Sequence, residues 1–127
     1  MRGTAGVGVI GLGVMGANLA RNLRSRGLVV AVYNRSADAT RTLVETTADE
    51  PGPPFVACDT LEAFAGALAA PRVSVLMVTA GAAVDGVIGG LGGFLAPGDV
   101  IVDGGNSHFT DTERRAVAAA AHDLVYV

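Results

Sequence analysis

The sequence predicts an α/β domain built on a doubly wound parallel sheet in three layers, and three observations predict it. Short apolar runs alternate with amphipathic stretches along the chain, as in a parallel sheet covered by helices. The run Leu28–Tyr33 is continuously β-branched, aliphatic or aromatic, which is typical of a strand buried on both faces. A glycine-rich run, Gly11–Gly16, follows the first apolar run, at the point where a strand would turn into a helix.

Three strand–helix units are expected in the first half of the chain. Gly27 ends the first helix, Ser36 is the N-cap of the second, and Thr60 or Asp59 caps the third. The segment Thr47–Pro54, with three prolines and a glycine, predicts a loop. The expected strands are Val7–Gly11, Leu28–Tyr33 and Phe55–Cys58, and the expected helices are Asn18–Arg26, Ala37–Thr46 and Thr60–Ala70.

The second half continues the alternation with weaker helices. The segment Ala82–Leu95 contains five glycines, each costing a helix about 0.5–1 kcal/mol relative to alanine, so a weak or broken helix is predicted. The expected strands are Val73–Thr79, Val100–Asp103 and Leu124–Val127, the turn is Pro97-Gly98, and the last helix is Thr110–His122. Because a domain rarely ends on a bare apolar run, we expect residues 1–127 to be one truncated domain, without a helical substrate and dimer domain.

Helical spacing also sorts side chains into core and surface. In the first helix, Leu19, Ala20 and Leu23 share one face, which leaves Arg21, Arg24 and Arg26 on other faces. Met15 is expected to be a core residue by its side chain, although its backbone lies on the glycine run. Cys58 is expected to be a small buried hydrophobe.

Composition excludes several classes of function. A chain of 127 residues with a net charge of −3 is long enough for one domain and gives no electrostatic footprint for nucleic acid. It has no apolar run long enough to span a bilayer. Cys58 is the only cysteine, so no internal disulfide is expected and the cytoplasm is the expected compartment. All nine basic residues are arginine, so no lysine is present to act as a general base.

The glycine run fits the pattern G-x-G-x-x-G. Gly11 would allow the tight turn, Gly13 would let the backbone approach a pyrophosphate, and Gly16 would let helix and strand pack closely. The free N–H groups and the dipole at the helix start would face the phosphates. With its strand and helix in place, the run predicts a Rossmann-type dinucleotide-binding domain, with Leu12, Val14 and Met15 as the residues between the glycines.

The end of the second strand indicates which dinucleotide is bound. Proteins that bind NAD carry an acidic residue about 20 positions after the glycine run, where it holds the ribose 2′-hydroxyl. Here Asn34, Arg35 and Ser36 follow the strand, so no carboxylate would repel a 2′-phosphate. Arg35 can clamp that phosphate through its forked donors, and Asn34 and Ser36 add neutral hydrogen bonds. The cofactor predicted is NADP; in the alternative interpretation, Asn34 and Ser36 are helix caps and Arg35 is merely solvated.

Two further segments follow strands at the same edge of the sheet, where open parallel sheets bind ligands. Val78-Thr79-Ala80-Gly81 follows one strand, and Asp103-Gly104-Gly105-Asn106-Ser107 follows the next. Asn106 offers both a donor and an acceptor. Taken alone, the second segment is also compatible with an ordinary turn and helix cap.

Together these segments resemble the 6-phosphogluconate dehydrogenase family. The likeness runs from Val7 to Val127, and its most specific part is the Asp-Gly-Gly-Asn-Ser block followed by Asp111-Thr112 and Arg114-Arg115. It implies oxidative decarboxylation of 6-phosphogluconate to ribulose 5-phosphate by a cytoplasmic homodimer of the pentose phosphate pathway, with hydride passed to NADP. The resemblance places Val78 and Ala80 beside the coenzyme and Asn106 against both the nicotinamide ribose and the substrate.

The sequence departs from the family in two respects that limit this expectation. Thr79 stands where the family carries a lysine near the coenzyme, and the family's catalytic lysine and glutamate would lie beyond Val127. No catalytic residue is therefore assigned in this chain, which is expected to be inactive alone. The alternatives are another β-hydroxyacid dehydrogenase, such as a hydroxyisobutyrate-type enzyme or an imine reductase, and a non-catalytic NADP-binding module. No metal site is predicted, because His108 and His122 are isolated.

Overall fold

The described residues form one sheet of six strands, and all of its paired strands are parallel. A computed structural model describes residues 4–69, 72–77, 86–87, 89–91, 94–95, 98–103 and 125–126. The strand order is β3-β2-β1-β4-β5-β6, which is the doubly wound order of dinucleotide-binding domains. The strands are β1 (Val7–Ile10), β2 (Val30–Tyr33), β3 (Val56–Ala57), β4 (Val73–Leu76), β5 (Val100–Asp103) and β6 (Val125–Tyr126).

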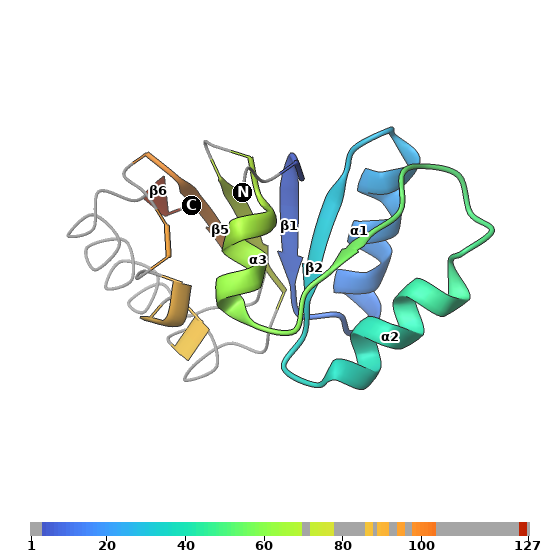
Figure 1. Ribbon diagram of the computed structural model, residues 1–127, viewed down its shortest axis with the longest axis horizontal. Helices are drawn as coiled ribbons and strands as arrows, with labels where there is room; N and C mark the ends of the chain where they lie inside the picture. The colour runs from blue at the N-terminus through green and yellow to red at the C-terminus, as the bar shows by residue number, and fades with distance from the viewer. Residues whose placement is uncertain are drawn as a thin grey trace.

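Strand β1 lies at the centre, and the chain winds outward from it in both directions. Val9 of β1 is in register with Val32 of β2 on one side and with Val75 of β4 on the other. Figure 1 shows α1 and α2 on the β2 side of β1, and β5 and β6 on the other side. At such a reversal of strand order, the carboxyl ends of the flanking strands open a crevice suited to a ligand.

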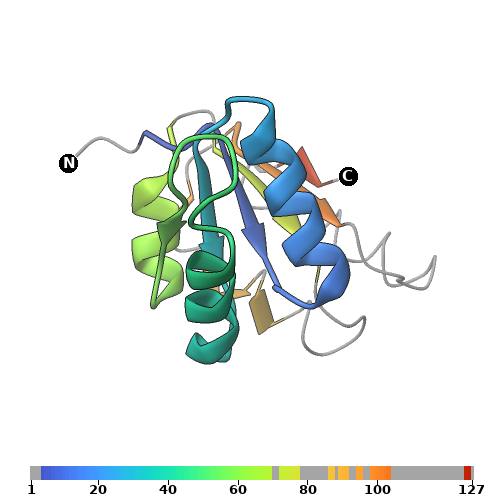
Figure 2. The ribbon, with the colours of Figure 1, turned by 90° about the vertical axis from the view of Figure 1, so that its right-hand side faces the viewer.

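Helices cover both faces of the sheet, so the domain has the three layers that the sequence predicts. The helices are α1 (Val14–Ser25), α2 (Ala37–Thr46) and α3 (Leu61–Ala67), and Figure 2 shows α1 and α3 on opposite sides of the sheet. Because successive strand residues point to opposite faces, Val9 packs in one core cluster with Ala20 and Leu43, and Ile10 packs in the other with Phe64.

The element boundaries differ from the sequence prediction at strand ends and at helix ends. Strand β2 begins two residues later than predicted, and β3 has two residues rather than four. Helix α1 begins at Val14, four residues before the predicted start, because Gly13 is already its N-cap. Helix α3 ends at Ala67 rather than at residue 70. The Thr60 hydroxyl caps α3 as predicted by accepting a hydrogen bond from the Ala63 N–H. Ser36 occupies the N-cap position of α2, but its hydroxyl makes no capping hydrogen bond.

Several predicted elements lie wholly or partly outside the described residues. Of the glycine-rich segment 82–95, residues 86–87 and 89–91 are helical, and Leu91 is fully buried. The predicted helix 110–122 lies outside the described residues. No helix in the described part of the chain is long and apolar enough to cross a membrane.

An ion pair between the partly exposed Arg72 and the buried Asp99 joins the starts of β4 and β5. The Arg72 backbone N–H donates to Asp99 Oδ1 at 2.8 Å, and Arg72 Nη1 lies 3.4 Å from Asp99 Oδ2. Arg72 Nε also donates to the Ala65 carbonyl of α3 at 3.0 Å. The pair therefore fixes one half of the sheet to the helix that covers it.

Candidate functional site

The glycine run forms a tight bend at the carboxyl end of β1. Gly11 has a φ of 94°, a conformation that glycine adopts at no steric cost. The Gly11 N–H donates to the Tyr33 carbonyl at 3.0 Å, and the Met77 N–H donates to the Ile10 carbonyl at 2.7 Å. These two bonds hold the bend between the ends of β2 and β4, at the centre of the crevice.

Helix α1 begins directly after this bend with free N–H groups. Gly13 is the N-cap, and the first helical bond runs from the Ala17 N–H to the Gly13 carbonyl at 2.8 Å. The N–H groups of residues 13–16 have no partner among the described residues, and the first turn contains no acidic residue. This helix start therefore carries the positive end of the helix dipole and donors that suit an anion.

Gly16 brings helix and bend into direct contact. A Cβ built on Gly16 would lie 1.8 Å from the Gly11 carbonyl oxygen, closer than any two non-bonded atoms can approach. Around Gly13, by contrast, an added Cβ would meet no atom within 4 Å. Gly16 is thus needed for packing, whereas Gly13 leaves open space over the helix start.

Val14 and Met15 are the most exposed large apolar residues in the described part of the chain. Their exposed fractions are 81% and 71%, so the expectation that the Met15 side chain lies in the core is wrong. The helix starts earlier than the sequence pattern indicated, which turns Met15 outward while Gly16 and Ala20 face the sheet. Leu12 is buried, as a member of the core cluster around Val9.

The residues after β2 lie beside the glycine bend. Asn34 Oδ1 accepts a hydrogen bond from the Leu12 N–H at 2.8 Å, and Asn34 Nδ2 donates to the Ser36 carbonyl at 3.0 Å. Arg35 is exposed and makes no hydrogen bond or ion pair with a described residue. Asp38, in the first turn of α2, is paired with Arg41. The structure therefore brings Gly11–Gly16 and Asn34–Ser36 together at one edge of the sheet.

The other residues predicted for the site are not placed. Val78, Ala80 and Asn106 lie outside the described residues. Strands β4 and β5, which precede them in the chain, end at the same edge of the sheet as β1 and β2, since all pairs are parallel. Among the described residues, no group of three histidine, cysteine or acidic side chains could hold a metal ion.

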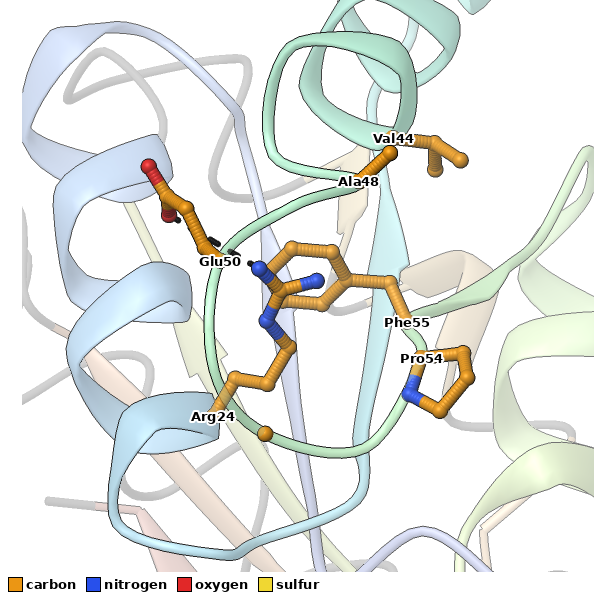
Figure 3. Close-up of a pocket in the computed structure, with 7 residues that line it drawn as sticks. Arg24, Val44, Ala48, Glu50, Pro54 and Phe55 are labelled. Atoms are coloured by element: carbon orange, nitrogen blue, oxygen red, sulfur yellow. Dashed lines mark ion pairs between the residues drawn. The ribbon is translucent and has the colours of Figure 1, made fainter.

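Sequence reasoning missed Arg24, which the structure buries at the opposite end of the sheet. Its exposed fraction is 4%, and it is buried on the same side of α1 as Ala20, so the prediction that it lies on another face than the apolar residues is wrong. The guanidinium stacks over the Phe55 ring at 4.4 Å, and Nη2 donates to the Thr47 carbonyl at 2.7 Å. Figure 3 shows the guanidinium inside the loop between α2 and β3. The signal in the sequence is the spacing, because Arg24 follows Gly16 and Ala20 at intervals of four.

The loop around Arg24 closes against the helix backbone and leaves a hollow of about 230 Å³. Gly52 has a φ of 117°, and a Cβ there would lie 2.3 Å from the Arg24 carbonyl oxygen. Glu50 lies at the rim, 3.7 Å from Arg24 Nη2, and pairs with Arg21 at 2.6 Å. This cluster fixes the path of the chain into β3 and takes no part in the crevice at the other end of the sheet.

Cys58 is buried after β3, as the sequence predicts, with an exposed fraction of 5%. Burial raises the pKa of its thiol, and the nearby Asp59 carboxylate adds to the rise. The group is therefore a protonated thiol at neutral pH rather than a nucleophilic thiolate.

Comparison with known proteins adds to this geometry. The family model for the NAD binding domain of 6-phosphogluconate dehydrogenase matches residues 6–127. The decarboxylating 6-phosphogluconate dehydrogenase of Bacillus licheniformis is 50% identical over 127 residues, which are all of this chain and 26% of that protein. The NAD(+)-dependent decarboxylating enzyme of Bacillus subtilis (strain 168) is 50% identical over 109 residues, which are 86% of this chain and 23% of that protein.

A solved structure extends the likeness to three dimensions. The 6-phosphogluconate dehydrogenase of Plasmodium falciparum, studied in its apo form and in complex with NADP+ or 6-phosphogluconate, is 35% identical to this chain with a TM-score of 0.88. The match covers 95% of this chain and 26% of that one. This chain spans about a quarter of the length of the relatives that it matches. Its fold, its glycine bend and the family model over residues 6–127 agree, and the chain belongs to the family of NAD binding domains of 6-phosphogluconate dehydrogenase.

Proposed function

We propose that the chain is the coenzyme-binding domain of an NADP-dependent 6-phosphogluconate dehydrogenase. The reaction would be oxidative decarboxylation of 6-phosphogluconate to ribulose 5-phosphate, for which the nicotinamide ring supplies the hydride acceptor. The observation that carries the choice of NADP is Arg35, an exposed guanidinium two residues after the end of β2 with no partner among the described residues. Since a relative at 50% identity is NAD(+)-dependent, family membership alone does not choose the coenzyme, and the charge at this strand end supports NADP.

The two ends of the crevice would bind different parts of the coenzyme. The free N–H groups of residues 13–16 at the start of α1 suit the pyrophosphate. Arg35 suits the 2′-phosphate because its planar guanidinium can donate two parallel hydrogen bonds to one phosphate. The Ser36 hydroxyl, which makes no capping bond, adds a neutral donor. Asp38 offers little repulsion, since Arg41 is paired with it.

The remaining parts of the proposal come from the family resemblance. Val78 and Ala80 would lie beside the coenzyme, and Asn106 would contact both the nicotinamide ribose and 6-phosphogluconate. The acid–base groups would come from outside residues 1–127, because the chain has no lysine. We expect the whole protein to be a cytoplasmic homodimer of the pentose phosphate pathway.

The coenzyme preference is tested by titrating the protein with NADPH and NADH and following nicotinamide fluorescence. We expect tighter binding of NADPH. Arg35→Ala should weaken NADPH binding about 10- to 100-fold, since one charge-assisted hydrogen-bonding partner is lost, and should leave NADH binding nearly unchanged.

Arg26→Ala is the matched control for this experiment. Arg26 is also an exposed arginine, but it lies just after the last turn of α1, where its Nε donates to Asn22 Oδ1 at 3.2 Å. Its removal changes the net charge by the same amount and should leave both affinities unchanged. Equal or tighter NADH binding by the unaltered protein would contradict the choice of NADP.

A further inference from the structure

Both polar atoms of the Asn34 side chain are held by the protein itself. Oδ1 accepts from the Leu12 N–H at 2.8 Å, and Nδ2 donates to the Ser36 carbonyl at 3.0 Å. The orientation of the amide is fixed by its partners, because a backbone N–H can only donate and a carbonyl oxygen can only accept. Arg35, the next residue, has no partner among the described residues.

The two partners of Asn34 belong to the two loops that would face the coenzyme in the proposed function. Leu12 lies between Gly11 and Gly13 in the bend before α1, whereas Ser36 is the N-cap of α2. Twenty-two residues separate Leu12 from Asn34, so their contact is a tertiary link. The side chain therefore sets the position of one helix start relative to the other.

We propose that Asn34 is a positioning residue that couples the pyrophosphate end of the crevice to its 2′-phosphate end, whereas Arg35 alone carries the charge that discriminates NADP from NAD. This inference rests on the proposed function, since it assigns parts within the same coenzyme site. It also implies that the Leu12 N–H is bound to Asn34 and does not contact phosphate, so that the backbone donors for the pyrophosphate come from residues 13–16.

Coupling and direct contact predict different responses to different ligands. NADP and NAD both span the crevice from α1 to α2, so both lose affinity when the two helix starts are no longer held at the right separation. Adenosine 2′-monophosphate reaches only the Arg35 end, so its affinity does not depend on that separation. A residue that touched the 2′-phosphate directly would instead affect NADP and adenosine 2′-monophosphate together and spare NAD.

The experiment compares Asn34→Ala with Arg35→Ala in the same protein, using NADP, NAD and adenosine 2′-monophosphate as probes. For Asn34→Ala we expect NADP and NAD to bind about tenfold more weakly, since the Leu12 N–H loses its partner, while adenosine 2′-monophosphate changes less than about twofold. For Arg35→Ala we expect a different pattern: NADP and adenosine 2′-monophosphate should both bind more weakly, while the affinity for NAD should be unchanged.

Two outcomes would overturn the inference. The first is an Asn34→Ala variant whose affinity for adenosine 2′-monophosphate falls as much as its affinity for NADP, which would indicate direct contact or general loss of structure. The second is measured on the unaltered protein, so it can be obtained even if the variant does not fold. We expect slow hydrogen exchange of the Leu12 amide without coenzyme. Fast exchange would show that the hydrogen bond to Asn34 is absent. If the unaltered protein binds neither dinucleotide, the proposed function fails, while the Leu12 amide still tests the link.

Discussion

Glu50 is held by two arginines that α1 presents one turn apart. Its carboxylate accepts hydrogen bonds from Arg21 Nε at 2.9 Å and from Arg21 Nη2 at 2.6 Å, and Arg24 Nη2 lies 3.7 Å away. The hydrogen bonds to Arg21 lower the pKa of Glu50 from its usual value of about 4.5. The same hydrogen bonds raise the pKa of Arg21.

The lowered pKa makes the stability of the protein depend on pH in a defined direction. A carboxyl whose pKa is lower in the folded state stabilises the fold above its unfolded pKa, and that contribution is lost as the pH falls through the folded pKa. Glu50→Gln should therefore be less stable to urea than the unaltered protein at pH 7, and this difference should shrink as the pH falls from the unfolded pKa of Glu50 through its lower folded pKa. Glu45→Gln, at an exposed carboxylate without an ion pair in the described part of the chain, should show no such difference.

The role of Arg24 shows where residue-level prediction from sequence ends. Charge and helical spacing separate arginines from apolar side chains, and Arg21 and Arg26 are exposed as that rule predicts. Arg24 is buried because a carbonyl and a phenyl ring from a loop more than 20 residues later accept it. Spacing within the helix indicates that position 24 faces the same way as Gly16 and Ala20, but it does not identify these partners, which only the tertiary fold brings together.

At the scale of secondary structure, α1 and the bend before it pack as one unit. Gly16 allows the helix and the bend to touch, whereas Gly13 leaves open space over the helix start. The strand, the bend and the helix are predictable because the spacing of Gly11, Gly13 and Gly16 has a steric reason that is local to the sequence. The start of α1 is not, because Val14 and Met15 are apolar yet exposed, so they do not follow the amphipathic pattern of the rest of the helix.

Substitution of these glycines should separate folding from binding. In Gly16→Ala, the new Cβ would collide with the Gly11 carbonyl, so we expect a loss of about 2 kcal/mol or more in the free energy of unfolding. In Gly13→Ala, nothing lies within 4 Å of the new Cβ and the φ of −66° suits alanine, so stability should hold. Coenzyme affinity should fall even so, because the methyl group occupies the space over the helix start.

Denaturant unfolding followed by circular dichroism measures the free energy of unfolding of these variants, and dinucleotide titration measures their coenzyme affinity. A stable Gly16→Ala variant would show that the helix can move away from the bend at little cost. Unchanged dinucleotide affinity in Gly13→Ala would show that the coenzyme does not approach this backbone.

At the scale of the whole molecule, strand order and layers follow from the alternation of apolar and amphipathic segments. The regular spacing of strand and helix signals predicts a parallel sheet, and right-handed crossovers then leave few arrangements. The four-residue β5 matches its predicted bounds because Pro97-Gly98 marks a turn before it. The site is predictable only in part. The sequence places Asn34 and Arg35 beside each other, but it does not indicate that Asn34 is held by Leu12 whereas Arg35 has no partner among the described residues.

The chain by itself should bind coenzyme without turning over substrate. NADPH at about 100 times its dissociation constant adds about 2.7 kcal/mol to the stability of a protein that binds it only when folded, which should raise the melting temperature by about 10 °C for a domain of this size. With NADP and 6-phosphogluconate together, purified residues 1–127 should produce no absorbance at 340 nm, because the chain has no lysine and spans only 26% of the length of the Bacillus licheniformis relative.

The matched control for the melting experiment is 6-phosphogluconate alone, which should leave the melting temperature unchanged. Measurable NADPH formation by residues 1–127 would contradict the proposal that the acid–base groups come from outside these residues.

The burial of Arg24 has an evolutionary consequence. One guanidinium contacts the Thr47 carbonyl and the Phe55 ring, while Gly52 rests on the helix backbone at the same residue. A deletion in the loop between α2 and β3 would move at least one of those partners out of reach of Arg24. A shorter side chain at position 24 would in turn remove the need for a loop of the present length. Among homologous genes, insertions and deletions between α2 and β3 should therefore coincide with replacement of the arginine, a covariation that aligned genomes can reveal without a purified protein.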